Sequence, residues 1–140
     1  RSVMRVNRKA FYRCPNTGRS SEKKVDGWEY WASTLEYKVY KALLATTPYV
    51  IKQHEIELLP ACEGFKATRW TPDFYLPETN TLVEAKGNWI TAKGHGAAKA
   101  LLLVHCRLAV KQGYKLCIVS DRDIKLGDLK VQHYETQPWL

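Results

Sequence analysis

Residues 71–87 read Thr-Pro-Asp-Phe-Tyr-Leu-Pro-Glu-Thr-Asn-Thr-Leu-Val-Glu-Ala-Lys-Gly. Short apolar stretches flank the Pro-Glu-Thr-Asn turn formers, and this pattern predicts an antiparallel hairpin. Successive side chains of a strand point to opposite faces, so Glu84 and Lys86 emerge on the same face. The hairpin also brings Asp73 back to that end. The stretch therefore predicts two acids and one lysine at one end of a hairpin.

The residue types at this end fit a metal-dependent phosphodiesterase. Mg²⁺ prefers hard oxygen ligands and keeps several waters, so one or two carboxylates and a substrate phosphate hold it. Asp73 and Glu84 would be those carboxylates, and the carbonyl of Ala85 is a further candidate ligand. Lys86 would position or deprotonate the water that the metal activates, or stabilise the charged phosphate. The alternative is an edge hairpin whose charged side chains form surface ion pairs, each contributing about 0–1 kcal/mol.

A fourth acid, Glu36, lies in a predicted helix over 34–45 that ends before Pro48. Glu36 is off the apolar stripe of this helix and shares another stripe with Tyr40. Ser33 and Glu36 also have the spacing of a capping box, in which Glu36 would bind the Ser33 backbone N–H. Two roles for Glu36 therefore stay open, a helix cap and a site residue. The apolar stripe consists of Leu35, Val39, Ala42 and Leu43.

Three segments of the chain resemble the PD-(D/E)XK nuclease superfamily. They are 33–39 with Glu36, 70–77 with Pro72-Asp73, and 82–89 with Glu84-x-Lys86. The amino-acid sequences of these segments are most similar to T7-type phage endonuclease I, a family of resolvases of four-way DNA junctions. The resemblance spans about residues 30–120. Because the superfamily also contains restriction enzymes and homing endonucleases, the motif indicates the chemistry better than the substrate.

The resemblance implies an α/β fold, a restriction-endonuclease-like core in which helices flank a mixed central sheet. It also implies that Glu36, Asp73 and Glu84 form the acidic metal-binding set and that Lys86 is the catalytic lysine. Mg²⁺ would be the cofactor, with Mn²⁺ as a substitute. The chain departs from the junction resolvases in a longer stretch before Glu36 and a shorter end after the last buried strand. These peripheral parts commonly determine substrate geometry and oligomeric form.

Composition agrees with a polyanionic partner. The net charge is +8, and the first thirty residues carry eight basic and three acidic residues, or +5 of that total. Aromatic residues alternate with the basic ones, so segment 1–30 is predicted to be a basic arm that contacts phosphates and bases, followed by a nuclease domain over 31–140. The alternative is a solvated arm that only aids solubility. The candidate DNA contacts are Arg5, Arg8, Lys9, Arg13 and Arg19 in the arm, with Lys93 and Lys99 beyond the hairpin.

Periodicity and turn residues predict the remaining elements. We expect a strand over 49–59, a loop over 61–69, a helix over 97–111, a buried strand over 116–119 and a final strand over 130–134. Gln53 in the first of these lies either near the metal or on an ordinary polar face. The helix would make a parallel crossover between the hairpin and the buried strand, with Cys106 and Cys117 in the core. The apolar stripe of this helix consists of Ala97, Leu101, Val104 and Leu108.

The sequence also argues against several classes of protein. The four cysteines show no paired spacing, so neither a zinc site nor a disulfide framework is expected, and such usage is typical of a reducing compartment. No apolar run reaches the length of a membrane span, and the Arg-rich beginning lacks the apolar block of a secretory signal. We therefore expect an intracellular protein with no membrane partner, in the cytoplasm or nucleoid of a bacterial host, with a phage or mobile element as candidate source.

These features predict a Mg²⁺-dependent deoxyribonuclease that hydrolyses phosphodiester bonds, with four-way (Holliday) junctions and other branched DNA of recombination as favoured substrates. A cut in both strands needs two active sites, so a homodimer or larger homo-oligomer is expected. Two alternatives remain open, a homing or restriction-type endonuclease on linear duplex DNA and a non-catalytic DNA-binding subunit. The four residues that argue against the non-catalytic alternative are Glu36, Asp73, Glu84 and Lys86.

Overall fold

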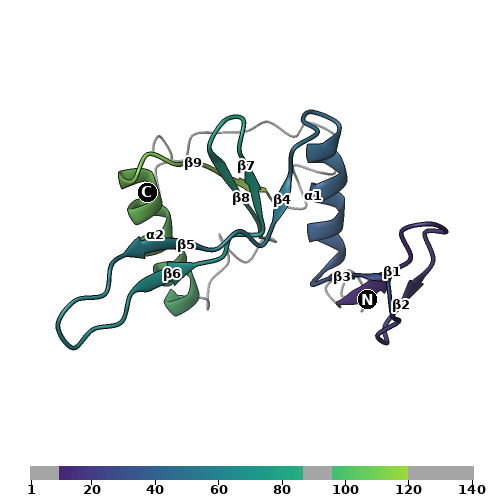
Figure 1. Ribbon diagram of the computed structural model, residues 1–140, viewed down its shortest axis with the longest axis horizontal. Coiled ribbons are helices and arrows are strands. Elements are labelled where there is room, and N and C mark those ends of the chain that lie inside the picture. Colours follow the sequence, from purple (N-terminus) through teal and green to yellow (C-terminus); the bar gives the residue numbers. More distant parts are fainter. Residues whose placement is uncertain (1–9, 87–95, 120–140) are drawn as a thin grey trace.

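A computed structural model describes residues 10–86 and 96–119 (Figure 1). Within these residues the protein is mixed α/β, with three sheets and two helices. The elements follow in the order β1 (Phe11–Arg13), β2 (Ser20–Ser21), β3 (Glu29–Trp31), α1 (Thr34–Leu44), β4 (Ile51–Lys52), β5 (Ile56–Leu59), β6 (Thr68–Trp70), β7 (Phe74–Leu76), β8 (Thr81–Ala85), α2 (Gly96–Lys111) and β9 (Lys115–Val119). The final strand predicted over 130–134 lies outside the described residues.

The largest sheet has the strand order β4-β7-β8-β9. Its centre is the predicted hairpin, in which β7 pairs antiparallel with β8 and Phe74 lies opposite Val83. Strand β9 pairs parallel with β8, and Glu84 lies opposite Ile118. Because α2 connects these two parallel strands, the predicted crossover is confirmed, and the sheet is mixed as expected. Phe74, Val83 and Leu82 are almost fully buried in its core.

Helix α1 begins and ends within one residue of its predicted range. The Ser33 Oγ accepts a hydrogen bond from the Glu36 backbone N–H at 3.1 Å, which satisfies one of the unpaired donors of the first turn. Three of the four predicted apolar positions are buried, and Ala42 is half-buried. The buried positions are Leu35, Val39 and Leu43.

Helix α2 also forms where it was expected, but its buried face was predicted wrongly. Leu101 and Val104, which were assigned to the apolar stripe, are 58% and 49% exposed. The helix instead packs against β5 and β9 through Leu102, Cys106 and Ala109. Small side chains carry little weight in a search for apolar periodicity, yet they let a helix approach a sheet closely. The core positions predicted for Cys106 and Cys117 are confirmed.

The single strand predicted over 49–59 is wrong because the chain turns in its middle. Gln53 has a φ of 52°, a left-handed conformation that interrupts an extended strand. Strand β4 before it pairs with β7, whereas β5 after it pairs with β6. The loop predicted over 61–69 is correspondingly too long, since β6 begins at Thr68.

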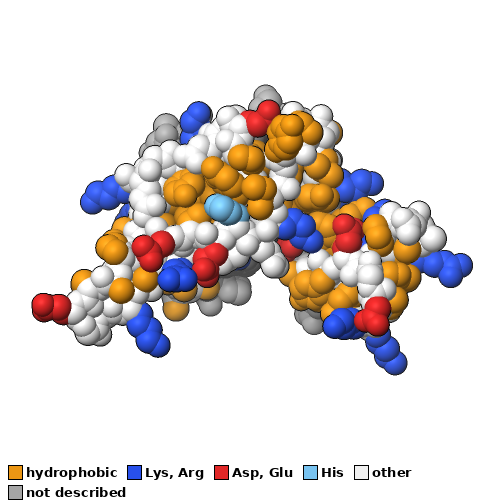
Figure 2. Space-filling view, in the orientation of Figure 1, with side chains coloured by type: hydrophobic (Ala, Val, Ile, Leu, Met, Phe, Trp, Pro, Cys, Tyr) orange, Lys and Arg blue, Asp and Glu red, His pale blue; other side chains and the backbone are white. Residues whose placement is uncertain are grey.

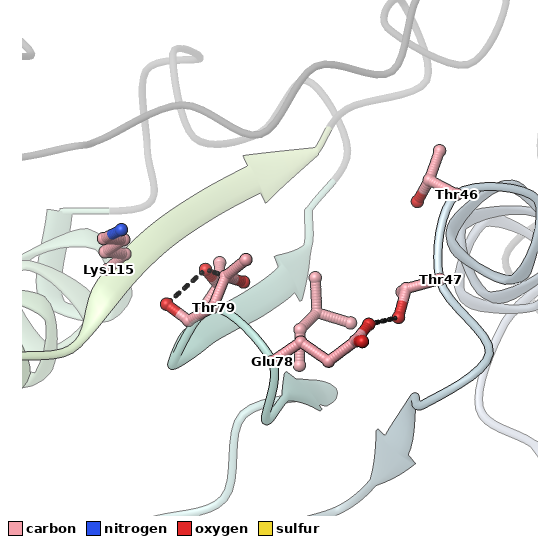
Figure 3. Close-up of a pocket in the computed structure, with 7 residues that line it drawn as sticks. Thr46, Thr47, Glu78, Thr79 and Lys115 are labelled. Atoms are coloured by element: carbon pink, nitrogen blue, oxygen red, sulfur yellow. Dashed lines mark hydrogen bonds between the residues drawn. The ribbon is translucent and has the colours of Figure 1, made fainter.

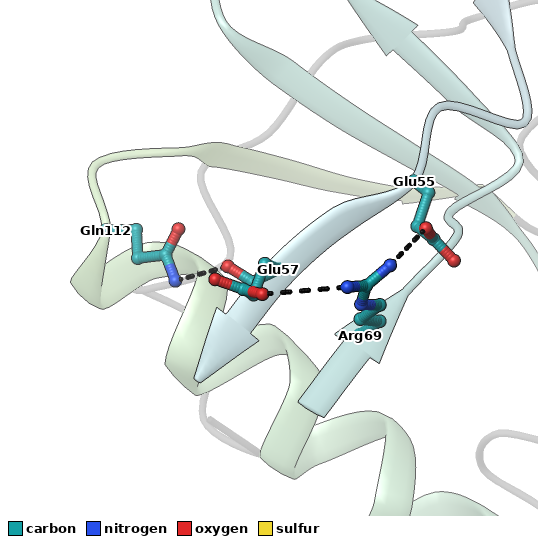
Figure 4. Close-up of polar contacts among 4 residues, drawn as sticks. All are labelled: Glu55, Glu57, Arg69 and Gln112. Atoms are coloured by element: carbon teal, nitrogen blue, oxygen red, sulfur yellow. Dashed lines mark hydrogen bonds and ion pairs between the residues drawn. The ribbon is translucent and has the colours of Figure 1, made fainter. Parts of the chain in front are cut away.

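The β5–β6 hairpin is held by contacts on its polar face (Figure 4). Arg69 lies between Glu57 of β5 and Glu55, which precedes that strand, with its Nη1 3.3 Å from the Glu55 Oε1 and its Nη2 3.9 Å from the Glu57 Oε1. The Gln112 side chain donates to the backbone carbonyls of Glu57 and Leu58 at 2.9 and 2.7 Å. These bonds fasten the hairpin to the end of α2.

The first part of the described chain forms a three-stranded antiparallel sheet, although no strands were predicted there. Its order is β2-β1-β3, and Phe11 of β1 lies opposite Trp31 of β3. The Trp31 ring is fully buried and packs against Tyr37 and Tyr40 of α1, with ring centroids 5.1 and 5.0 Å apart. The sheet therefore crosses the boundary predicted at residue 30 and is joined to α1.

The space-filling view shows the β5–β6 hairpin and the three-stranded sheet projecting on either side of a hollow (Figure 2). Lysine and arginine side chains extend from both projections as well as from the body. Neither of the two helices in the described ranges has the length and apolarity needed to cross a membrane.

Candidate active site

Asp73 and Glu84 meet at the open end of the β7–β8 hairpin through a reciprocal pair of hydrogen bonds. The Asp73 backbone N–H donates to the Glu84 Oε1 at 3.0 Å. The backbone N–H of Ala85 donates to the Asp73 Oδ2 at 2.7 Å. The backbone of Asp73 thus holds the Glu84 carboxylate. The backbone of Ala85, the residue after Glu84, holds the Asp73 carboxylate. The predicted proximity of these two acids is confirmed.

Lys86 completes this group on the same face as Glu84. Its Nζ lies 3.3 Å from the Glu84 Oε2, as the two-residue spacing predicted. Its backbone N–H donates to the Val119 carbonyl at 2.9 Å, which fixes the chain just after β8. The Lys86 side chain is 28% exposed whereas that of Glu84 is 10% exposed, so the lysine lies between the buried acids and solvent.

Glu36 faces this group from the first turn of α1. Its residue is only 6% exposed, although it carries a charge-bearing side chain. The capping bond uses the Glu36 backbone N–H and the Ser33 hydroxyl, so the Glu36 carboxyl is not consumed in it. That carboxyl interacts electrostatically with Asp73, Lys52 and Lys86. Glu36 therefore takes part in the helix cap through its backbone N–H, while its carboxyl is oriented toward the site.

The structure brings the predicted residues together to different degrees. Asp73, Glu84 and Lys86 are joined by direct contacts, and Asp73 is close enough to Glu36 to raise the pKa of the Glu36 carboxyl. Across residues 10–86 and 96–119, no three His, Cys, Asp or Glu side chains form a group that could hold a metal ion. The three acids therefore do not constitute a preassembled metal cage.

Burial dominates the electrostatics of these acids. Removal from water raises the pKa of Glu36 to about 7, and the nearby Asp73 adds to the rise. Burial likewise raises the pKa of Glu84 to about 7, again with a contribution from Asp73. The pKa of Asp73 is also raised by burial, against the opposing effect of the Ala85 N–H. Burial therefore raises the pKa values of both carboxyl groups, and the backbone N–H donors and Lys86 offset this rise only in part.

Lys52 of β4 is a site residue that sequence patterns did not reveal. Its Nζ lies 3.5 Å from the centroid of the Trp31 ring and donates to the Tyr30 carbonyl at 3.2 Å. Desolvation lowers the pKa of Lys52, and the charge of Glu36 opposes that change. The neighbouring Gln53, named as a candidate from sequence, has an exposed side chain and contributes a backbone N–H to the Asp73 carbonyl at 3.1 Å. Lys52 is recognised as a neighbour of Glu36 only from the structure, in which β4 pairs with β7.

The predicted DNA contacts are distributed over the molecule. Arg13 packs over the Tyr37 ring at 5.0 Å and lies 3.9 Å from the Glu29 carboxylate. Arg19 is exposed, and Lys99 is half-buried on α2. The remaining candidates, Arg5, Arg8, Lys9 and Lys93, lie outside the described residues.

The turn end of the β7–β8 hairpin carries a separate polar pocket of about 300 Å³ (Figure 3). Its side chains bond to one another, because the Thr47 hydroxyl donates to the Glu78 carboxylate and the Thr79 and Thr81 hydroxyls are 2.8 Å apart. This pocket lies at the opposite end of the hairpin from Asp73. Its internal bonding indicates a structural role.

The chain matches no model of a protein family, no curated protein and no solved structure. The geometry of the acids and lysines, together with the sequence motif, therefore forms the basis for a function.

Proposed function

We propose that this protein is a Mg²⁺-dependent DNA endonuclease with a PD-(D/E)XK core and that branched DNA is its favoured substrate. One observation carries the proposal. At the end of a mixed sheet, the Asp73 N–H bonds the Glu84 carboxylate, the Ala85 N–H bonds the Asp73 carboxylate, and the Lys86 ammonium lies beside Glu84. Burial of two carboxyl groups costs a structural hairpin stability. A hydrolytic site can use such groups to hold a cation.

The donor set fits a hard divalent cation. Two buried carboxyl groups with raised pKa values offer the oxygen atoms that Mg²⁺ prefers, and a bound cation would favour their ionised forms. Asp73 and Glu84 would hold the ion, with the Ala85 carbonyl and Glu36 as further ligands and Mn²⁺ as a substitute. When bound, Mg²⁺ stabilises negative charge on the phosphate and lowers the pKa of its water.

The protein's own residues would supply orientation and proton transfer. The Lys86 Nζ, placed between the buried acids and solvent, is positioned to contact a phosphate oxygen or the attacking water. Burial raises the pKa of Glu36 to about 7 in the metal-free protein, so its carboxylate, where it does not bind the ion itself, is suited to accept a proton from that water near neutral pH. The charge of Lys52 favours the ionised form of Glu36. Basic residues on both projections would attract the DNA backbone.

Substitution of the two acids tests the chemistry. Asp73→Asn keeps an oxygen for the Ala85 N–H but removes the charge, and Glu84→Gln does the same for the Asp73 N–H. Each should lower Mg²⁺-dependent cleavage by about 100-fold or more. Binding in Ca²⁺ should persist, because phosphate contacts supply most non-specific affinity. The matched control is Glu63→Gln, at an exposed position of the β5–β6 turn. Undiminished cutting by Asp73→Asn would refute the mechanism.

Substrate class is tested with a matched set of labelled DNAs, comprising an immobile four-way junction, linear duplex, single strand and a random-sequence duplex library. A junction enzyme cuts unrelated junctions near the branch point and spares the arms as linear duplex. A sequence-specific enzyme selects a consensus from the library, because each correct base pair contributes about 1–3 kcal/mol. Cleavage of one library consensus with intact junctions would refute the branched substrate and leave the proposed active site in place.

A further inference from the structure

A second cavity, of about 280 Å³, opens beside the candidate active site. Glu84 and Lys86 form one side of it, so any group bound there is adjacent to the proposed site of hydrolysis. The remaining lining residues come from β6 and from one side of α2. They are Trp70, Ala98, Leu101, Leu102 and His105.

The wall contributed by β6 and α2 is aromatic and apolar. The rings of Trp70 and His105 have centroids 5.5 Å apart and planes inclined by 30°. Burial lowers the pKa of His105, so its ring is uncharged at neutral pH. Among the described residues that line the cavity, Lys86 is the cationic one, together with Glu84 on the same side. The described wall from β6 and α2 carries no charged side chain and fits a flat, weakly polar group.

Leu101 leaves apolar surface at the rim of the cavity exposed to water. Leu101 is 58% exposed, although its neighbour Leu102 is buried. A planar ligand in the cavity would cover part of this surface, and such burial is favourable in proportion to the apolar area removed from water. Val104 is 49% exposed on the same helix but does not line the cavity.

We infer that this cavity receives an unstacked nucleobase next to the phosphodiester bond that is cut. The inference rests on the proposed nuclease function and narrows its substrate class to DNA whose base at the cut site is unpaired or readily leaves its stack, as at a flap, a single-stranded segment or a branch point. A base inside a duplex is stacked on both faces and must leave the helix to enter such a cavity. Aromatic and apolar side chains bind exposed bases by stacking, with little dependence on sequence.

Filling the cavity from its rim tests the inference. Leu101→Trp places a large ring at the mouth, and Val104→Trp is the matched control because it adds the same ring at a similarly exposed position of α2. In the full chain with Mg²⁺, Leu101→Trp should lower kcat/KM on single-stranded and junction DNA about tenfold or more, the range expected for loss of one stacked base. Val104→Trp should cut at the wild-type rate. Circular dichroism of both variants checks that they are folded.

A second measurement removes the base instead of the cavity. Abasic nucleotides are placed one at a time on either side of the cleaved bond of the junction. Wild type should lose about tenfold in kcat/KM when the abasic nucleotide is at one of these positions. The Leu101→Trp variant should show little further loss with that abasic DNA, because the substitution and the missing base remove the same contact. His105→Ala should resemble Leu101→Trp, and His105→Phe, which keeps a ring, should retain most of the wild-type rate.

The outcomes separate this inference from the proposed function. If wild type cuts no DNA in Mg²⁺, the nuclease proposal itself is refuted. If wild type cuts DNA but is insensitive to every abasic position and to Leu101→Trp, the cavity does not bind a base, and the nuclease proposal stands. If both tryptophan variants lose activity and sedimentation shows that both change self-association, this face of α2 is an interface between copies of the chain and the inference is refuted.

Discussion

Raising the pH from 5 to 8 in the absence of divalent cations should destabilise this protein. The pKa of Glu36 rises from 4.5 in the unfolded chain to about 7 in the folded protein, because its carboxyl is buried near Asp73. Between these two values the folded state retains a proton that the unfolded state has lost. The free energy of unfolding therefore falls as the pH rises through this interval, and it levels off above the folded pKa.

The magnitude follows from the size of the shift. Each pKa unit corresponds to about 1.4 kcal/mol, so Glu36 alone accounts for a loss of roughly 3 kcal/mol between pH 5 and pH 8. Glu84, whose pKa is also raised to about 7 by burial and by the nearby Asp73, acts in the same direction. A domain with a total stability of about 5–15 kcal/mol would show this loss clearly.

Urea unfolding followed by circular dichroism at pH 5, 6, 7 and 8 in EDTA measures the effect. Glu36→Gln removes one titrating group, so its stability should fall with pH by roughly 3 kcal/mol less than that of wild type. Mg²⁺ or Ca²⁺ should restore stability at pH 8 and have little effect at pH 5, because bound cations compete with protons. Equal pH slopes for wild type and Glu36→Gln would refute the assignment of Glu36 to a buried, cation-responsive site.

Three further outcomes are expected from single substitutions. Lys86→Arg should lower the cleavage rate by orders of magnitude with unchanged DNA binding in Ca²⁺, since a planar guanidinium does not replace a compact ammonium; a near wild-type rate would confine Lys86 to charge balance. Lys52→Met should move the acidic limb of the pH–rate profile upward, because Glu36 loses a neighbouring cation, and Lys52→Arg should leave the limb in place. Leu43→Ala should cost about 2–5 kcal/mol in urea unfolding, since Leu43 is 1% exposed in the core; a change below 1 kcal/mol would show that α1 packs loosely.

The hairpin and the acids at its end could be predicted because the relevant signals are local. Turn residues fix the pairing of β7 with β8, and strand alternation then places Glu84 beside Lys86 without knowledge of any other element. The helix around Glu36 is likewise encoded in its own cap and apolar spacing. The nuclease function and the roles of the site residues stay predictions that the substitutions above test.

The remaining features depend on contacts between distant segments. Strands β1, β2 and β3 have two or three residues each, too few for alternation to be recognised, and their order follows from packing of Trp31 on α1. The buried face of α2 follows from close approach at Cys106 and Ala109. Lys52 becomes a neighbour of Glu36 because β4 pairs with β7, an arrangement followed by a bend of the chain at Gln53.

Strand β8 shows most directly that this end of the sheet is not optimised for stability. Thr81, Leu82, Val83 and Glu84 are all buried, and an apolar residue at the last of these positions would avoid the cost of burying a carboxyl group. The Asp73 N–H and Lys86 favour the ionised form of Glu84, yet burial still raises its pKa, so these contacts offset that cost only in part. These acids are buried, have raised pKa values and contact each other, and a lysine lies between them and solvent. Such an arrangement is expected where function opposes stability. A divalent cation bound as proposed would supply the missing charge, so the residues expected to destabilise the metal-free protein at high pH are also those proposed to carry the chemistry.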